Sequence, residues 1–174
     1  MVTRRKLILS AAAALLTPVP PRPAAAADDP AGILTAIYTR VAEGKGDGGG
    51  AFVIQTKASR TKYLSNALVA LWAKADARTR KGDGGPVDFD PVTNSQDPDV
   101  KSFKLAAEKL GADKATVAVT IESHRREGRA NPGDKTIRYD LVHEAGQWKI
   151  DDIKGAVDGG PWSVRALLVA SLKR

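Results

Sequence analysis

The segment 114–123, KATVAVTIES, decides the fold, because its apolar residues alternate with small or hydroxyl-bearing ones. That period of two is typical of a strand with one buried face. The segment 136–144, TIRYDLVHE, repeats the pattern. Ala145-Gly146 then predicts a tight turn into a further strand over 147–153, QWKIDDI. Strands that follow one another through short turns form an antiparallel meander.

Upstream, 101–110 is expected to be the first strand, with Phe103 and Leu105 facing inward, although its alanine and lysine content also permits a helix. The stretch 87–100 contains too many prolines for regular structure. The polar loop 124–135 contains Asn131-Pro132-Gly133-Asp134, which favours a turn.

Three helices are expected around this sheet. The first begins at Asp29-Pro30 and ends at Gly44, because Asp suits the N-cap and Pro the first helical position. The second covers 59–80, and the last starts at Pro161. Helices first and antiparallel strands second predict an α+β fold. We expect a curved sheet of about four strands packed against three helices that cover its concave face.

One apolar side of each element is predicted to meet in a single core. The expected core residues are Leu68, Leu71, Trp72, Val117, Val119, Ile121, Leu141, Trp148, Ile150 and Leu168.

Residues 1–27 have the order of a secretory signal peptide: a basic head, a short apolar run and small residues before a cleavage site after Ala27. The apolar run of about ten residues is too short to span a bilayer. Thr3-Arg4-Arg5-Lys6 also resembles a twin-arginine signal. We therefore expect a periplasmic or secreted protein with one domain over 28–174.

Charge and cysteine content narrow the class of partner. The net charge is +7, but four basic residues leave with the signal, so the remaining chain carries +3. That small charge and the expected export argue against nucleic acid. The chain has no cysteine, which excludes disulfides and lipid attachment near the signal. No stable membrane anchor is expected after cleavage.

Several short motifs appear in an order that resembles a known family. They are 88–91 DFDP, 94–97 NSQD, 148–153 WKIDDI and 163–165 SVR. This chain resembles the exported bacterial domain of unknown function 3828 family, within the nuclear transport factor 2-like superfamily of cone-shaped α+β folds, also described as cystatin-like. The resemblance covers roughly 33–172. It implies a cone-shaped fold but no activity, because fold alone does not fix function.

The acidic segment 88–99 is a candidate cation site. Its oxygen ligands suit calcium, but the spacing of an EF-hand fails at Val92 and Thr93, so turn capping is the better interpretation. An alternative is a structural plug with Asp97 buried beside an arginine such as Arg138 or Arg165.

Pocket candidates come mainly from the inward faces of the strands. His143 continues the row of Ile137, Tyr139 and Leu141 and is a candidate base with a pKa near neutrality. The alternative interpretation is that His143 is a hydrogen-bonded histidine at the margin of the sheet, because the sequence pattern would be the same. Asp151 and Asp152 should point to opposite faces. The candidate ligand-binding residues are Asp97, Tyr139, Asp140, His143, Asp152 and Arg165.

No catalytic set, metal site or cofactor motif is predicted. The two histidines, His124 and His143, lack the spacing of a zinc site. The glycine-rich stretch 44–49 lacks the strand that precedes a dinucleotide loop, so it predicts a plain loop. The basic patch 124–129 predicts a solvated hairpin tip or a contact for an anionic partner.

These observations favour an exported accessory or binding protein of the cell envelope without enzymatic activity. Its expected partners are an envelope protein or a small ligand, and a homodimer is one expected assembly. The alternatives are a small-ligand carrier that uses the cone pocket, and an isomerase- or lyase-like enzyme with a histidine or aspartate base.

Overall fold

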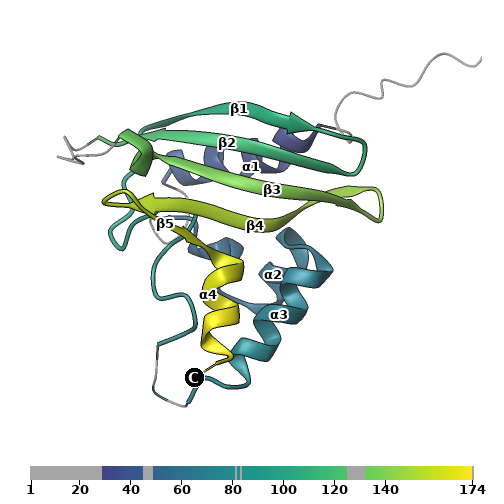
Figure 1. Ribbon diagram of the computed structural model, residues 1–174. Coiled ribbons are helices and arrows are strands. Elements are labelled where there is room, and N and C mark those ends of the chain that lie inside the picture. The colour runs from purple at the N-terminus through teal and green to yellow at the C-terminus, as the bar shows by residue number, and fades with distance from the viewer. Residues whose placement is uncertain (1–28, 45–48, 81, 83, 125–131, 174) are drawn as a thin grey trace, which may run out of the picture.

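A five-stranded antiparallel sheet organises the chain (Figure 1). The computed structural model describes residues 29–44, 49–80, 82, 84–124 and 132–173. The expected signal peptide, the centre of the glycine-rich loop and most of the basic patch lie outside these residues. The strands run in the spatial order β1-β2-β3-β4-β5. Their bounds are β1 Ser102–Leu110, β2 Lys114–Glu122, β3 Thr136–Glu144, β4 Gln147–Val157 and β5 Gly160–Ser163.

The register places the apolar residues of neighbouring strands in rows on one face. Val119 lies opposite both Leu105 and Ile137. Val119 and Ile137 belong to the hydrophobic core, and the half-buried Leu105 packs against it. The turn between β3 and β4 has positive φ at Ala145 (50°) and Gly146 (77°), as a two-residue hairpin turn requires. The predicted antiparallel meander is confirmed.

The end of the chain differs from the prediction, because Pro161 belongs to a fifth strand instead of starting a helix. Asp158 and Gly159, with φ of 51° and 78°, form a second two-residue turn that folds β5 back onto β4. Pro161 is tolerated there because β5 is an edge strand. Helix α4 (Val164–Ser171) starts three residues later, with Ser163 as its N-cap.

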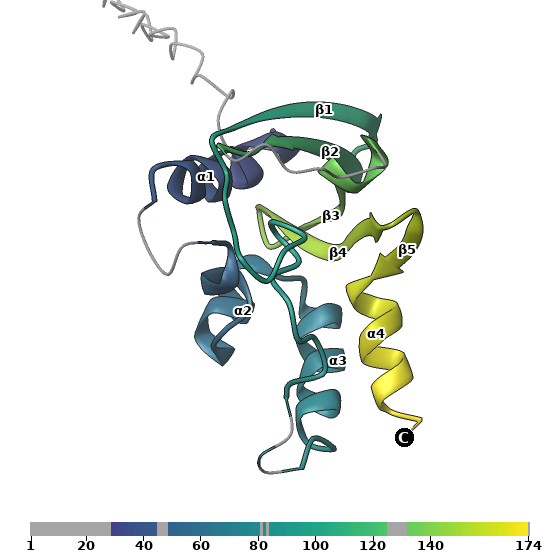
Figure 2. The ribbon, with the colours of Figure 1, turned by 90° about the vertical axis from the view of Figure 1, so that its left-hand side faces the viewer.

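Helix α1 (Pro30–Ala42) lies across the concave face of the sheet (Figure 2). The Asp29 carboxylate accepts a hydrogen bond from the Ala31 backbone N at 2.9 Å, as predicted for the N-cap. Its buried face contacts β1, β2 and β4. That face consists of Pro30, Leu34, Ile37, Tyr38 and Val41.

The helix predicted over 59–80 is two helices, α2 (Lys57–Tyr63) and α3 (Asn66–Asp76). Ser65 causes the break, because its backbone N donates to the carbonyl of Ile150 in β4 at 2.8 Å. Its Oγ accepts from the Leu68 N at 3.0 Å and so caps α3. Helices α3 and α4 lie side by side below the sheet (Figures 1 and 2).

The expected core is confirmed except at one position. Leu71 is half-buried because the buried stripe of α3 runs through Leu68, Trp72 and Ala75 and leaves Leu71 at its margin. In the part of the chain that the structure describes, no helix is long and apolar enough to cross a membrane.

Candidate functional site

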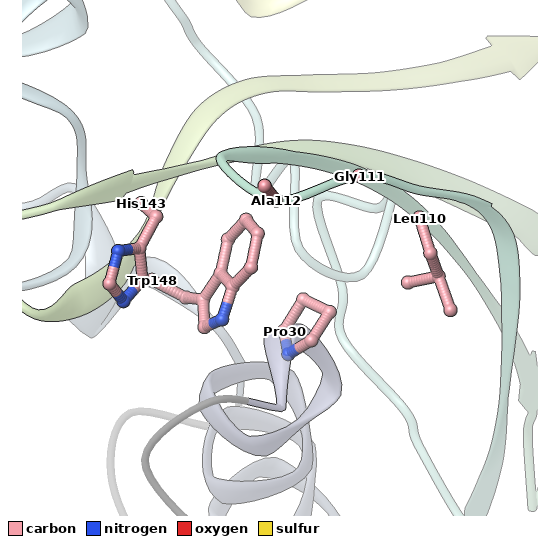
Figure 3. A pocket seen from close by; sticks show the side chains of 6 residues that line it. All are labelled: Pro30, Leu110, Gly111, Ala112, His143 and Trp148. Carbon is pink, nitrogen blue, oxygen red and sulfur yellow. The ribbon is translucent and has the colours of Figure 1, made fainter.

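A pocket of about 260 Å³ lies where two strand hairpins meet the start of α1 (Figure 3). We name it the hairpin-end pocket. Pro30 is the first residue of α1, Leu110 is the last residue of β1, and Gly111 and Ala112 belong to the β1–β2 connection. The β3–β4 hairpin contributes the aromatic side. The pocket is lined by Pro30, Leu110, Gly111, Ala112, His143 and Trp148.

The register of the β3–β4 hairpin creates the aromatic side of the pocket. His143 pairs directly with Trp148, and their rings meet nearly edge to face at 5.2 Å between centroids. Trp148 is 8% exposed and belongs to the core. Leu110, at 68% exposure, is a large apolar side chain in water at the pocket's rim. The pocket therefore joins the core to an exposed apolar residue.

His143 supplies the pocket's one titratable side chain. Its backbone N donates to the Asp113 carbonyl at 2.9 Å, which fixes the strand end. Its Nε2 atom is buried and has no hydrogen-bond partner among the described residues. None of the other lining side chains carries a carboxylate, hydroxyl or amine. The pocket can hold an apolar group beside one imidazole, but it offers no second group for acid–base chemistry.

Tyr139 lies in the interior of the fold and does not line this pocket. Its hydroxyl is 2.8 Å from that of Tyr38, which donates to the Val92 carbonyl at 2.6 Å. Burial raises the pKa of both phenols, and the nearby Asp90 carboxylate raises both further. These contacts give Tyr139 a packing role.

The acidic segment 88–99 packs beside Tyr38 and Tyr139. The residues that do so do not include Asp97. The Asp90 carboxylate accepts hydrogen bonds from the backbone N of Gly50 and of Val92 and from the Thr93 hydroxyl, at 2.7–3.0 Å. Val92 is completely buried. Asp90 therefore caps a turn, as the preferred interpretation of this segment predicts. Asp97 is exposed, so the expectation that it is buried beside an arginine is wrong.

Both of the arginines considered for Asp97 have other partners. Arg138 of β3 pairs with Glu108 of β1, on the far side of β2, at 2.9 Å. Arg165 pairs with Asp151. The acidic segment 88–99 is held in place by Asn94, whose amide nitrogen donates to the carbonyls of Asp134 and Ala156.

Asp140 lies in a polar row across the strands. Its carboxylate accepts from the Thr116 hydroxyl at 3.0 Å and from the Lys154 ammonium at 2.6 Å. Asp140 is half-buried, and neither it nor its partners line the hairpin-end pocket.

Asp152 and Arg165 secure the start of α4. The Asp152 carboxylate accepts from the backbone N of Arg165 at 3.0 Å and from the Ser163 hydroxyl at 2.7 Å. Asp151 is the extra residue of a β-bulge, because Asp140 pairs with Asp152 while Leu141 pairs with Ile150. Both carboxylates therefore contact Arg165, and the expected strict alternation of Asp151 and Asp152 does not hold.

The structure thus places one predicted site residue, His143, in the hairpin-end pocket. Sequence reasoning expected Trp148 only in the core and missed Pro30 and the three residues 110–112. Within the described residues, no group of three histidine or acidic side chains is placed to hold a metal ion. Comparison of the chain with protein-family models, curated proteins and solved structures finds no match.

Proposed function

We propose that this chain is an exported, non-enzymatic binding protein of the cell envelope. It holds an apolar group of its partner in the hairpin-end pocket. The composition of that pocket supports the proposal, because five of its six lining residues are apolar or glycine and Leu110 extends the apolar surface into water. The volume of about 260 Å³ is slightly below that of pockets for drug-sized ligands, so it suits a single side chain or ring.

The same proposal includes the family and the location. The order of motifs from 88–91 to 163–165 supports membership of the domain of unknown function 3828 family. The curved antiparallel sheet with α1 across its concave face is compatible with a nuclear transport factor 2-like cone. The signal-like pattern over 1–27 supports a periplasmic or secreted location.

Two other functions have weaker support. A small-ligand carrier would use the same pocket, and its ligand would be no larger than a single ring. An isomerase- or lyase-like enzyme would use His143 as a base, but the pocket provides no partner group that orients or complements the imidazole. The binding function therefore ranks first.

Binding is tested on isotope-labelled chain 28–174 by nuclear magnetic resonance, with N-acetyl-leucine amide and indole as probes. We expect dissociation constants on the order of 1–10 mM. The shifted amides should cluster at Gly111, Ala112, His143 and Trp148. Leu110→Glu should weaken both probes, because it places a charge at the apolar rim.

Val157→Glu is the matched control, because Val157 is an exposed apolar residue beside the β4–β5 turn and outside the pocket. It should leave probe binding unchanged. Shifts scattered over the surface, or equal weakening by both substitutions, would contradict the proposed pocket.

A further inference from the structure

Cations of α1 and α2 lie over two aromatic rings on the side of the molecule that carries α2, and a lysine of β4 contacts the α2 backbone. The Arg40 guanidinium lies 4.0 Å from the Phe52 ring centroid, and the Lys62 Nζ lies 4.9 Å from that of Tyr63. The two rings meet edge to face at 5.8 Å. The Lys149 Nζ donates to the Lys62 carbonyl at 2.6 Å. We name these residues, together with Lys57, the exposed first residue of α2, the α2 surface: Arg40, Phe52, Lys57, Lys62, Tyr63 and Lys149.

The charge of the α2 surface is strongly one-sided. Helix α2, KASRTKY, has three basic residues and no acidic one. Arg60 is half-buried, because it pairs with Asp76 and stacks on Trp72. Lys57 and Lys62 are exposed, and neither forms an ion pair with another described residue.

Among the described residues, the elements that flank α2 contribute two acidic residues beside the four cations of the α2 surface. Glu43 follows α1, and the Glu144 carboxylate accepts a hydrogen bond from the Asn66 backbone N at the start of α3. The α2 surface therefore presents net positive charge beside two half-buried aromatic side chains.

We propose that the α2 surface docks reversibly on anionic phospholipid headgroups. Lysine and arginine near a negatively charged bilayer each contribute to binding, and aromatic side chains suit the headgroup region. Arg40 and Lys62 already lie over the faces of the two rings, so stacking on sugars or bases is disfavoured and charge dominates. The attachment is electrostatic, so salt reverses it.

The α2 surface is separate from the hairpin-end pocket. Pro30 lines the pocket at the start of α1, whereas Arg40 lies ten residues later on the same helix, roughly 15 Å along its axis. Membrane docking would bring the protein to a bilayer while leaving the pocket available. The inference goes beyond the proposed binding function and does not depend on it.

Co-sedimentation of chain 28–174, which contains every described element, with vesicles tests the inference. The chain should bind vesicles of equal parts phosphatidylglycerol and phosphatidylcholine, and pure phosphatidylcholine vesicles should not retain it. Raising sodium chloride from 50 to 500 mM should release it. Lys57→Gln and Lys62→Gln should each lower the partition coefficient about fivefold.

Lys109→Gln is the matched control, because it removes the same charge from an exposed position on β1. It should leave the partition coefficient unchanged. Equal loss with Lys109→Gln, or equal binding to pure phosphatidylcholine, would overturn the proposal. Retention on dextran sulfate that depends on Lys62, without binding to phosphatidylglycerol vesicles, would assign the surface to a soluble polyanion and also overturn it.

Discussion

Tyr38 and Tyr139 join α1 to the sheet through their hydroxyls, which lie 2.8 Å apart inside the fold. Tyr38 donates onward to the Val92 carbonyl, so the Tyr139 hydroxyl donates to the Tyr38 oxygen. Each hydroxyl is thereby satisfied without water. Neither phenol can ionise there without placing a negative charge in an apolar interior near Asp90.

This pair predicts a loss of stability at alkaline pH. The folded pKa of each phenol is raised above its usual value near 10, so its contribution is fully present below pH 10. Above pH 10 the unfolded chain loses these protons first, and the free energy of unfolding falls. Each phenol contributes a slope of up to about 1.4 kcal/mol per pH unit.

Urea unfolding between pH 8 and 11.5 measures that slope. Tyr139→Phe should reduce it by about 1.4 kcal/mol per pH unit, and Tyr38→Phe should reduce it similarly. Either variant also loses a hydrogen bond, which costs about 1 kcal/mol at neutral pH. A slope identical to that of the unsubstituted chain would show that the tyrosines do not titrate as argued.

At the scale of elements, Ser65 connects three parts of the fold. Its hydroxyl caps α3 and donates to Asp151 at 2.6 Å, and Asp151 also pairs with Arg165 of α4. Ser65→Ala should lower the free energy of unfolding by about 2 kcal/mol, because it removes both a cap and a bond to a carboxylate. Urea unfolding at pH 7 measures this loss.

Thr56→Ala is the comparison, because Thr56 caps the exposed helix α2 through the Ser59 N at 3.0 Å. It should cost about 0.5–1 kcal/mol. If the two substitutions cost the same, the link from Ser65 to Asp151 adds no stability.

The sequence allowed some elements to be predicted because their signals are local. Alternation over 114–123 and 136–144 and the turn at Ala145-Gly146 depend on neighbouring residues only. Asp158-Gly159 is an equally local hairpin signal, but the prediction does not use it, because it takes Pro161 as a helix start. The break at Ser65 was not predictable, because the apolar stripe continues from Leu64 to Leu68 and the interruption comes from a contact with the distant Ile150.

At the scale of the whole molecule, curvature creates the hairpin-end pocket. Pro30 and Leu110 are eighty residues apart and come together only because α1 crosses the concave face beneath two hairpin ends. The row of Ile137, Tyr139 and Leu141 predicts an inward-facing His143, and the structure places its buried Nε2 on the side of the sheet where its ring meets Trp148. No sequence pattern could indicate which loop lies next to it, because that depends on how strongly the sheet bends.

Trp148 connects this pocket to the stability of the whole fold. It is 8% exposed, belongs to the core and touches His143. Trp148→Ala should therefore lower the free energy of unfolding by about 3–5 kcal/mol, because it removes buried area and leaves a cavity. Leu110→Ala, at the exposed rim, should change it by less than about 0.5 kcal/mol.

The cavity left by Trp148→Ala also provides a direct check that the Trp148 side chain lies in the core. Indole should raise the melting temperature of that variant, because an apolar cavity accepts a ligand of matching shape and binding stabilises the folded state. It should have little effect on Trp72→Ala if the gap there closes around the Arg60 side chain that stacks on the ring. A loss below about 1 kcal/mol for Trp148→Ala would place the indole outside the core and remove the physical basis of the pocket.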